Sequence, residues 1–180
     1  MIRALGHRMI RRLEHRFDYD AAYMHEILDA STPAFLKFAL AQSMFGHREA
    51  LPAEAAFAAR FVALRAHDCG SCLQLAVDMA LAAGVTVGAV RAILARDFGA
   101  MSQDAALAVQ FADAVLANAP TEDLRRLASR RWGARGLVSM AYAIVTPQVY
   151  PLLKRALGHA QACERLVVDG EPVAGFRAVV

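Results

Sequence analysis

Two cysteines separated by two residues, in the sequence Cys69-Gly70-Ser71-Cys72, are the side chains of this chain best suited to chemistry. The tetrapeptide lies where one apolar segment with helical spacing ends and another begins. Thiols at this spacing readily form and break a disulfide. The free N–H groups and the positive dipole end of a helix N-terminus stabilise thiolates. The pattern therefore predicts redox chemistry at Cys69 and Cys72.

Three other ionisable side chains lie close enough in the sequence to be considered as helpers of a thiol. His67 precedes Cys69 by two residues; its imidazole could accept a thiol proton or, as a cation, lower the thiol pKa. The same position also suits a histidine that interacts only with the end of its own helix. Glu54 could supply a carboxylate or merely complement a helix N-terminus. Asp78 falls on a different helical stripe from Cys72, so we expect it to face solvent or another subunit.

The composition is typical of one compact intracellular domain. The chain has 180 residues, 57% of them hydrophobic, with six prolines and three cysteines. Residues 1–17 are basic and amphipathic and lack the continuous apolar stretch of a secretory signal. We therefore expect a cytoplasmic protein in which Cys163, the third cysteine, is a bystander. The uncharged run from Gly136 to Leu153 contains two prolines, so we expect a buried or subunit-interface helix rather than a membrane span.

The spacing of apolar residues predicts an all-α fold. Residues 1–159 are expected to form a single all-helical domain, and residues 160–180 a C-terminal tail. The first helix covers residues 1–17 and is amphipathic, with arginines on its outer face and an apolar face made of Ile2, Leu5, Met9, Leu13 and Phe17. Four further helices are expected at about 19–30, 32–46, 52–67 and 71–83. Three more are expected to start at Thr86, Ser102 and Thr121 and to stop near Gly99, Pro120 and Trp132-Gly133, respectively. A buried segment over 136–146 and a last helix from Pro147 to Gly158 follow. In the tail, Asp169-Gly170 between short apolar runs predicts a β-hairpin.

Several other functional classes lack their sequence signals. One Cys-x-x-Cys supplies only two of the four ligands that zinc normally takes, so we expect no metal. No glycine-rich phosphate or dinucleotide loop is present, and we therefore expect no cofactor. The net charge of +3 is concentrated in residues 1–16, which hold five arginines and one glutamate, rather than spread over a nucleic-acid-binding face.

The helical surroundings of the motif distinguish it from thioredoxin, in which the two cysteines follow a strand. From Leu51-Pro52 through the cysteines to the segment 102–158, which includes the run 107–115 (Leu-Ala-Val-Gln-Phe-Ala-Asp-Ala-Val), the chain resembles the AhpD-like alkylhydroperoxidase / carboxymuconolactone decarboxylase family. The resemblance implies an AhpD-like multi-helix bundle that forms homo-oligomers. In the redox members it also implies thiol-dependent reduction of peroxides or disulfides.

The chain departs from that family at two positions. The peroxidase pattern has a Glu twelve residues before the first cysteine and a His four residues after the second, where this chain has Phe57 and Ala76. The proton relay of the family is therefore missing from its usual places. The resemblance makes Cys72 the attacking thiol and Cys69 the resolving one, whereas activation by the helix N-terminus alone would leave either order open.

We expect a thiol-dependent oxidoreductase that uses Cys69 and Cys72, with His67 as the best remaining candidate for a catalytic helper. Its substrate would be a small peroxide or a protein disulfide, and the sequence does not identify its electron donor. The alternative is a non-catalytic oligomeric interaction or redox-sensing module of the same fold. No nucleic-acid partner is expected.

Overall fold

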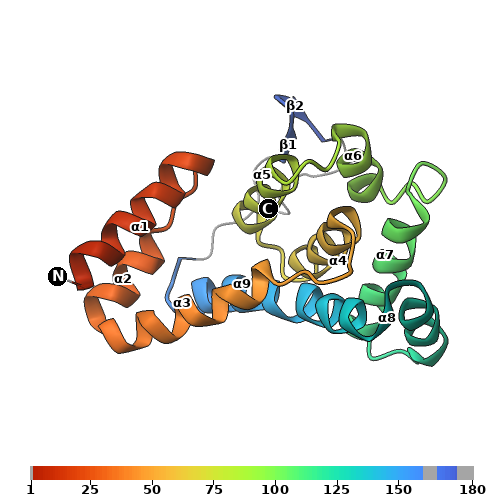
Figure 1. Ribbon diagram of the computed structural model, residues 1–180. Helices are drawn as coiled ribbons and strands as arrows, with labels where there is room; N and C mark the ends of the chain where they lie inside the picture. Colours follow the sequence, from red (N-terminus) through yellow and green to blue (C-terminus); the bar gives the residue numbers. More distant parts are fainter. Residues whose placement is uncertain (1, 160–165, 174–180) are drawn as a thin grey trace.

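The computed structural model describes residues 2–159 and 166–173 and has the predicted all-α architecture (Figure 1). Helices make up most of the described chain, and a short antiparallel hairpin follows them. The elements are α1 (Ile2–Phe17), α2 (Ala22–Ala30), α3 (Thr32–Gly46), α4 (Ala53–Arg65), α5 (Gly70–Ala82), α6 (Val87–Ala95), α7 (Gln103–Leu116), α8 (Glu122–Val145), the 3-10 turn η1 (Thr146–Gln148), α9 (Val149–Ala156), β1 (Val167–Val168) and β2 (Glu171–Pro172). Cys163 lies outside the described residues.

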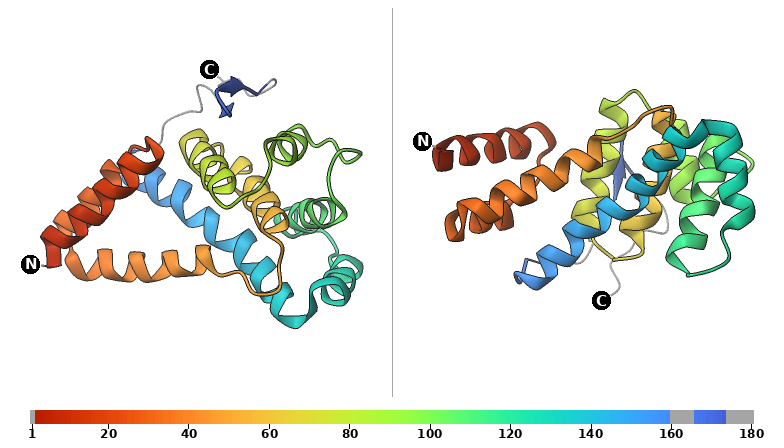
Figure 2. Two further views of the ribbon diagram at one scale, coloured as in Figure 1. Left: turned by 45° about the horizontal axis from the view of Figure 1, so that its top comes forward. Right: turned by 60° about the horizontal axis from the view of Figure 1, so that its bottom comes forward.

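The helices form two groups. Helices α1, α2 and α3 extend to one side as an arm, and α4 to α8 form the body (Figures 1 and 2). The arm has its own apolar cluster, which includes Ile10, Tyr23 and Phe38. Leu75 from α5 and Tyr150 from α9 pack against that cluster, so the arm and the body share apolar contacts.

Helix α4 is the centre of the body and packs against α5, α7 and α8. Its alanines at 55, 56, 58, 59 and 63 are completely buried. Their small side chains let neighbouring helices approach closely on several sides. The same helix leads directly into the turn before Cys69, so the packing of α4 positions the cysteine motif.

Side-chain caps explain several helix starts. Thr86 and Ser102 accept hydrogen bonds from Ala89 N and Ala105 N, as expected for N-caps at the predicted positions. Ser31, rather than the predicted Thr32, caps α3 by accepting from Ala34 N.

Two predicted boundaries were wrong, and a third was confirmed. The second helix begins at Ala22 rather than Tyr19, after Asp20 accepts a hydrogen bond from the Ala22 amide. Helix α6 ends at Ala95, well before Gly99, because Arg96 adopts a left-handed conformation with φ of 56°. The predicted stop at Trp132-Gly133 is confirmed: Gly133 has a non-helical backbone, with φ of 67° and ψ of −177°, so α8 consists of two helical segments that meet at a kink there.

The tail hairpin is confirmed in residues 166–173. Asp169 and Gly170 have φ of 53° and 77°, as a tight two-residue hairpin turn requires. The hairpin docks on α5: the Gln74 side chain accepts from Val167 N and donates to Val167 O, at 2.8 and 3.0 Å. Leu166 is fully buried against the body. The two strands are therefore stabilised by the helices beneath them rather than by each other alone.

The exposed apolar face of α1 differs from the prediction. Gly6 and Ile10 face the rest of the arm, whereas Ile2, Leu5 and Met9 are more than half exposed. The Leu28 side chain lies so close to Gly6 that a Cβ there would be 2.7 Å away. Close packing through this glycine turns the predicted apolar stripe partly outward.

The stretch Glu122–Ala156, which spans α8, η1 and α9, is the one candidate for a membrane span among the described residues. It qualifies by length and composition, and 44% of its most apolar window is buried inside the fold. Because core helices of soluble proteins pass the same test, this is weak evidence for a membrane location.

Helices α7 and α8 are joined by a polar contact at the edge of the core. Asp104, in the first turn of α7, accepts a hydrogen bond from the indole N–H of Trp132 at 2.6 Å and another from Arg131 Nη2 at 3.0 Å. The hydrogen-bonded guanidinium of Arg131 holds the pKa of Asp104 below its usual value. Trp132 is buried, with 6% of its surface exposed, and belongs to the main apolar cluster.

Candidate functional site

Cys69 and Cys72 are joined by a disulfide, with their Cα atoms 5.3 Å apart. Cys69 is the N-cap of α5 in an extended conformation, and one helical turn brings Cys72 back to it. Both sulfurs therefore lie at the N-terminal end of the helix, where unpaired N–H groups and the helix dipole favour negative charge. Cys69 is 8% exposed and Cys72 5%, so the pair is buried within the main apolar cluster.

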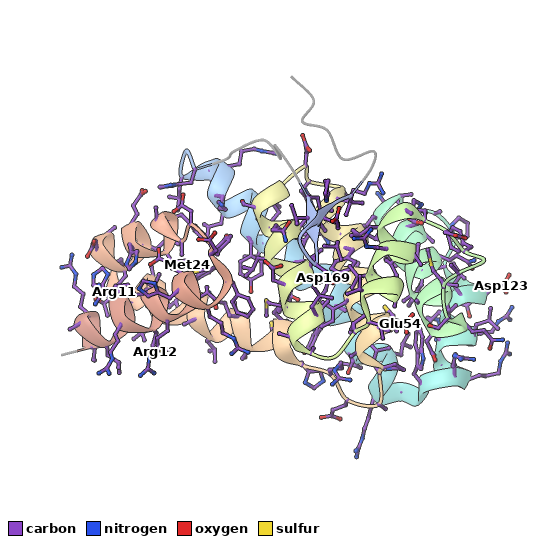
Figure 3. The ribbon with its side chains drawn as sticks, turned by 90° about the horizontal axis from the view of Figure 1, so that it is seen from above. Arg11, Arg12, Met24, Glu54, Asp123 and Asp169 are labelled. Carbon is purple, nitrogen blue, oxygen red and sulfur yellow. A yellow bond between two sulfur atoms is a disulfide. The ribbon has the colours of Figure 1, made fainter. Side chains whose placement is uncertain are left out.

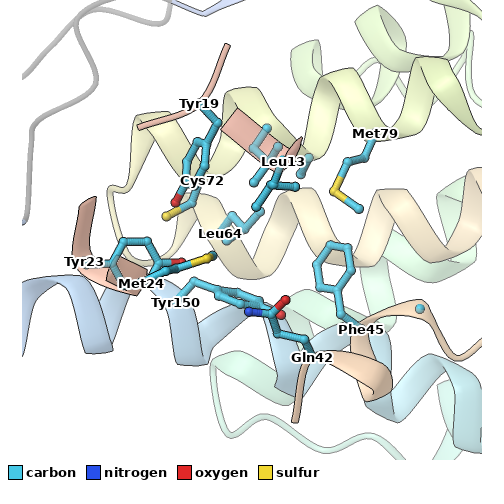
Figure 4. A pocket seen from close by; sticks show the side chains of 13 residues that line it. Leu13, Tyr19, Tyr23, Met24, Gln42, Phe45, Leu64, Cys72, Met79 and Tyr150 are labelled. Atoms are coloured by element: carbon cyan, nitrogen blue, oxygen red, sulfur yellow. The ribbon is translucent and has the colours of Figure 1, made fainter. Parts of the chain in front are cut away.

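A mainly apolar cavity of about 220 Å³ opens beside Cys72 (Figure 4). Its wall joins the arm to the body, because residues from α1, α2, α3, α4, α5 and α9 all contribute. Leu75, Ala76 and Met79 line it from the face of α5 that carries Cys72, as the helical spacing predicts. The remaining lining residues are Leu13, Tyr19, Tyr23, Met24, Gln42, Phe45, Gly46, Leu64 and Tyr150.

Three tyrosines make the cavity wall polar at a few points. Burial raises the pKa of Tyr19 and of Tyr150 to about 12, and it raises the pKa of Tyr23 as well. All three are therefore neutral hydroxyls at physiological pH. The Tyr23 hydroxyl interacts with the Tyr19 hydroxyl and has no other hydrogen-bond partner among the described residues. A buried hydroxyl at a cavity wall can also bind a polar atom of a ligand.

The two positions where the resembled family carries its relay are apolar here. Phe57 packs against the Phe61 ring and under the Arg60 guanidinium, whose carbon lies 4.6 Å from the Phe57 ring centre. Ala76 lies in the cavity wall. Burial lowers the pKa of Arg60 to about 10, and Arg60 donates a hydrogen bond to Phe45 O at the end of α3. Neither Phe57 nor Ala76 can carry a proton to a thiol.

His67, the predicted helper, has a different hydrogen-bond partner. Its Nε2 lies 3.0 Å from Gln148 Oε1, and Gln148 Nε2 donates to Ile144 O. Because Gln148 Nε2 donates to Ile144 O, Gln148 Oε1 is the acceptor and His67 Nε2 is the donor in this contact. The backbone carbonyl of His67 also accepts from Arg155. The structure thus brings Cys69 and Cys72 together and ties the imidazole of His67 to η1.

The two acidic alternatives are also engaged elsewhere. Glu54 accepts a hydrogen bond from Ser102 Oγ at 2.8 Å, which links α4 to the start of α7. Asp78 accepts from Gln74, the residue that holds the hairpin, and burial raises the pKa of Asp78. Figure 3 shows Glu54 on the body, far from Arg11 and Arg12 on the arm.

Sequence reasoning missed two polar residues beside the disulfide. Ser71 Oγ lies 3.8 Å from Cys69 Sγ and accepts a hydrogen bond from Lys154 Nζ at 2.9 Å. Lys154, from α9, is only 4% exposed, and burial lowers its pKa. Only its residue type could have drawn attention to Lys154 in the sequence. It is one of two lysines in a chain that otherwise uses arginine for positive charge.

No group of three or more potential metal ligands occurs in residues 2–159 or 166–173. The chain matches no protein-family model, no curated protein and no solved structure. The site must therefore be interpreted from its own geometry, with the family resemblance as a hypothesis.

Proposed function

We propose that the protein is a thiol-dependent oxidoreductase of the AhpD-like class, which cycles Cys69 and Cys72 between dithiol and disulfide. One observation carries the proposal: the two cysteines are disulfide-bonded at a helix N-terminus, and one of them lies in the wall of a cavity. A structural disulfide would need no such opening beside one of its sulfurs.

The placement of the cavity supports Cys72 as the thiol that meets the substrate. In peroxide reduction, the Cys72 thiolate would attack the terminal oxygen, break the O–O bond and release an alkoxide, which leaves as the alcohol after gaining a proton. The resulting sulfenic acid on Cys72 would then be attacked by the Cys69 thiolate, with formation of the disulfide and loss of water. The peroxide is reduced by two electrons, and the two thiols together supply them.

The lining favours a substrate with an apolar body. Leucine, methionine, phenylalanine and tyrosine side chains surround the space beside Cys72, and Gln42 and the tyrosine hydroxyls are its polar points. An organic hydroperoxide or a small uncharged disulfide fits this chemistry better than a charged one. Because general acid–base assistance is worth about 10²–10⁴-fold, the absence of the family relay predicts slow peroxide turnover.

A thiol count after exposure to hydroperoxide tests this function. Fully reduced protein carrying Cys163→Ser is treated with cumene hydroperoxide or with hydrogen peroxide, and the remaining thiols are identified by alkylation and peptide mass analysis. We expect loss of both thiols, a peptide linked through Cys69 and Cys72, and faster reaction with the apolar peroxide. Persistence of both thiols through prolonged exposure would remove the peroxidase proposal.

The position of the disulfide also favours a second candidate, an interaction module whose assembly responds to redox state. The cavity next to Cys72 is lined by residues of the arm, such as Leu13 and Met24, as well as of the body. Opening the disulfide would alter the end of α5 that faces the arm. Identical assembly of oxidised and reduced protein would speak against this candidate.

We also propose that the protein forms homo-oligomers through the arm, in a reducing cytoplasm. On α3, Leu36 and Leu40 are 50% and 73% exposed, and the outward residues of α1 are similarly uncovered. Leu36 and Leu40 lie one turn apart on α3, and contiguous exposed apolar side chains of this kind are typical of interaction surfaces. A second copy of the chain would bury them.

Substitution of Leu40 tests this assembly. We expect Leu40→Glu to lower the molar mass measured by light scattering, because a charge in an apolar contact is costly to bury. Leu127→Glu is the matched control, since Leu127 is 44% exposed on α8 and away from the arm. An unchanged mass for Leu40→Glu, or an equal loss for both variants, would contradict assembly through the arm.

A further inference from the structure

We propose that Ser71 and Lys154 form a two-step hydrogen-bond chain that stabilises the Cys69 thiolate released when the disulfide opens. This inference rests on the proposed redox cycle and assigns positioning residues to it. These two residues would replace part of the function of the glutamate and histidine that the resembled family uses. They would act by donating hydrogen bonds to the thiolate rather than by relaying a proton.

The hydrogen bonds from Lys154 through Ser71 to Cys69 all run in one donor-to-acceptor direction. Lys154 Nζ can only donate, so in its 2.9 Å contact with Ser71 the serine oxygen is the acceptor. The Ser71 hydroxyl hydrogen is then free to point at Cys69 Sγ, 3.8 Å away. The sequence of donors runs from the ammonium group through the hydroxyl to the sulfur. Its strength increases when that sulfur becomes negatively charged.

Within the described chain, Lys154 is a buried cation without a salt bridge, which suggests a role beyond packing. Only 4% of the Lys154 surface is exposed. Its ammonium group nevertheless forms no salt bridge within residues 2–159 and 166–173. The groups that face it are the rings of Tyr19 and Tyr23, with centres 5.2 and 5.5 Å from Nζ, and the more distant carboxylate of Asp20. A buried cation is costly when the anion that acts on it, here Asp20, forms no salt bridge with it. A thiolate on Cys69 would supply the missing anion.

The chemical step that benefits is the reduction of the disulfide by a donor thiol. A donor thiolate attacks Cys72 Sγ from the cavity, a bond forms between the two sulfurs, and the Cys69–Cys72 bond breaks. Cys69 leaves with the electron pair as a thiolate. Ser71 donates to that thiolate and Lys154 donates to Ser71. A second donor thiolate then attacks the donor's own sulfur in the mixed disulfide, which releases Cys72 and yields the oxidised donor.

The residue type fits this role. Arginine stays protonated in proteins, whereas lysine can release a proton when its surroundings favour the neutral form. Burial lowers the pKa of Lys154, and the negative charge of Asp20 opposes that effect. A charged lysine at this position can hold the Ser71 hydroxyl in the orientation that donates to the Cys69 thiolate.

The test measures the ionisation of Cys69 in isolation. In a background of Cys72→Ser and Cys163→Ser, thiolate absorbance is followed against pH with the unchanged chain, Lys154→Met, Lys154→Arg and Ser71→Ala. We expect Lys154→Met to raise the Cys69 pKa by about one unit, a typical value for loss of a nearby opposite charge. Ser71→Ala should shift it in the same direction, and Lys154→Arg should stay closer to the unchanged chain.

Lys37→Met is the control, because it removes the same charge from the exposed face of α3. If Lys154→Met fails to fold, Ser71→Ala still decides the question, since it removes only a hydroxyl. A Cys69 pKa that is unchanged in Ser71→Ala and in any folded Lys154 variant would overturn the inference. That result leaves the redox function intact, which fails only if the Cys69–Cys72 pair does not cycle.

Discussion

Serine in place of Cys69 should convert a complete disulfide exchange into a trapped intermediate. With the uncharged probe 4,4′-dithiodipyridine, reduced protein with both cysteines releases two thiopyridone molecules, because Cys69 resolves the first adduct. In Cys69→Ser we expect one molecule to be released and one pyridyl group to remain on Cys72. The reason is placement: Cys72 lines the cavity, and Cys69 is not among the residues that line it. Absorbance and intact mass measure both quantities.

The reverse variant, Cys72→Ser, is the matched control. Its remaining thiol, Cys69, has no access from the cavity, so we expect adduct formation to be slower by about a hundredfold, the scale of a misplaced reacting group. Both variants carry Cys163→Ser to silence the third thiol. Equal rates for the two variants, or a stable adduct only on Cys69, would contradict the assignment of Cys72 as the attacking thiol.

Removal of the Trp132 side chain should be the most destabilising of the substitutions considered. Trp132→Ala deletes a buried ring from the main cluster and the indole N–H that binds Asp104, so we expect a loss of about 3–5 kcal/mol in the free energy of unfolding. We expect the loss of stability to affect the cysteine site as well, because α7 and α8 both pack against α4, which leads into the cysteine motif. Urea denaturation monitored by circular dichroism measures the loss.

Two further variants separate the contributions to that loss. Trp132→Phe keeps most of the ring but gives up the hydrogen bond, which is worth about 1 kcal/mol. Leu127→Ala, on the exposed surface of the same helix, should change stability by no more than about 0.5 kcal/mol. A loss for Trp132→Ala as small as that for Leu127→Ala would show that the α7–α8 contact does not hold the body together.

Much of the fold was predictable because its signals are local. The periodic apolar spacing of α1, the capping residues Thr86 and Ser102 and the Asp169-Gly170 turn act within a few residues, and the structure has each of them. The errors arose where distant contacts decide. Ile2, Leu5 and Met9 are exposed because close packing at Gly6 sets which side of α1 faces its neighbours.

In the candidate site too, the local features were predictable and the distant contacts were not. The pairing of Cys69 with Cys72 follows from three residues of helical separation, and the inert face of α5 follows from its period. Lys154 is 83 residues from Ser71, so no local pattern connects them. The arm residues that close the cavity are equally remote from Cys72 in the sequence. Sequence reasoning identified the two cysteines that form the disulfide and could not identify the side chains that pack around them.

An equilibrium redox titration of the Cys163→Ser protein, in buffers of oxidised and reduced dithiothreitol, measures the proposed dithiol–disulfide cycle directly. Alkylation followed by peptide mass analysis gives the fraction of each thiol at every potential. If Cys69 and Cys72 form a redox pair, we expect one reversible two-electron transition in which both cysteines change together. A pair that stays in one state across the whole range, or two cysteines that respond independently, would contradict it.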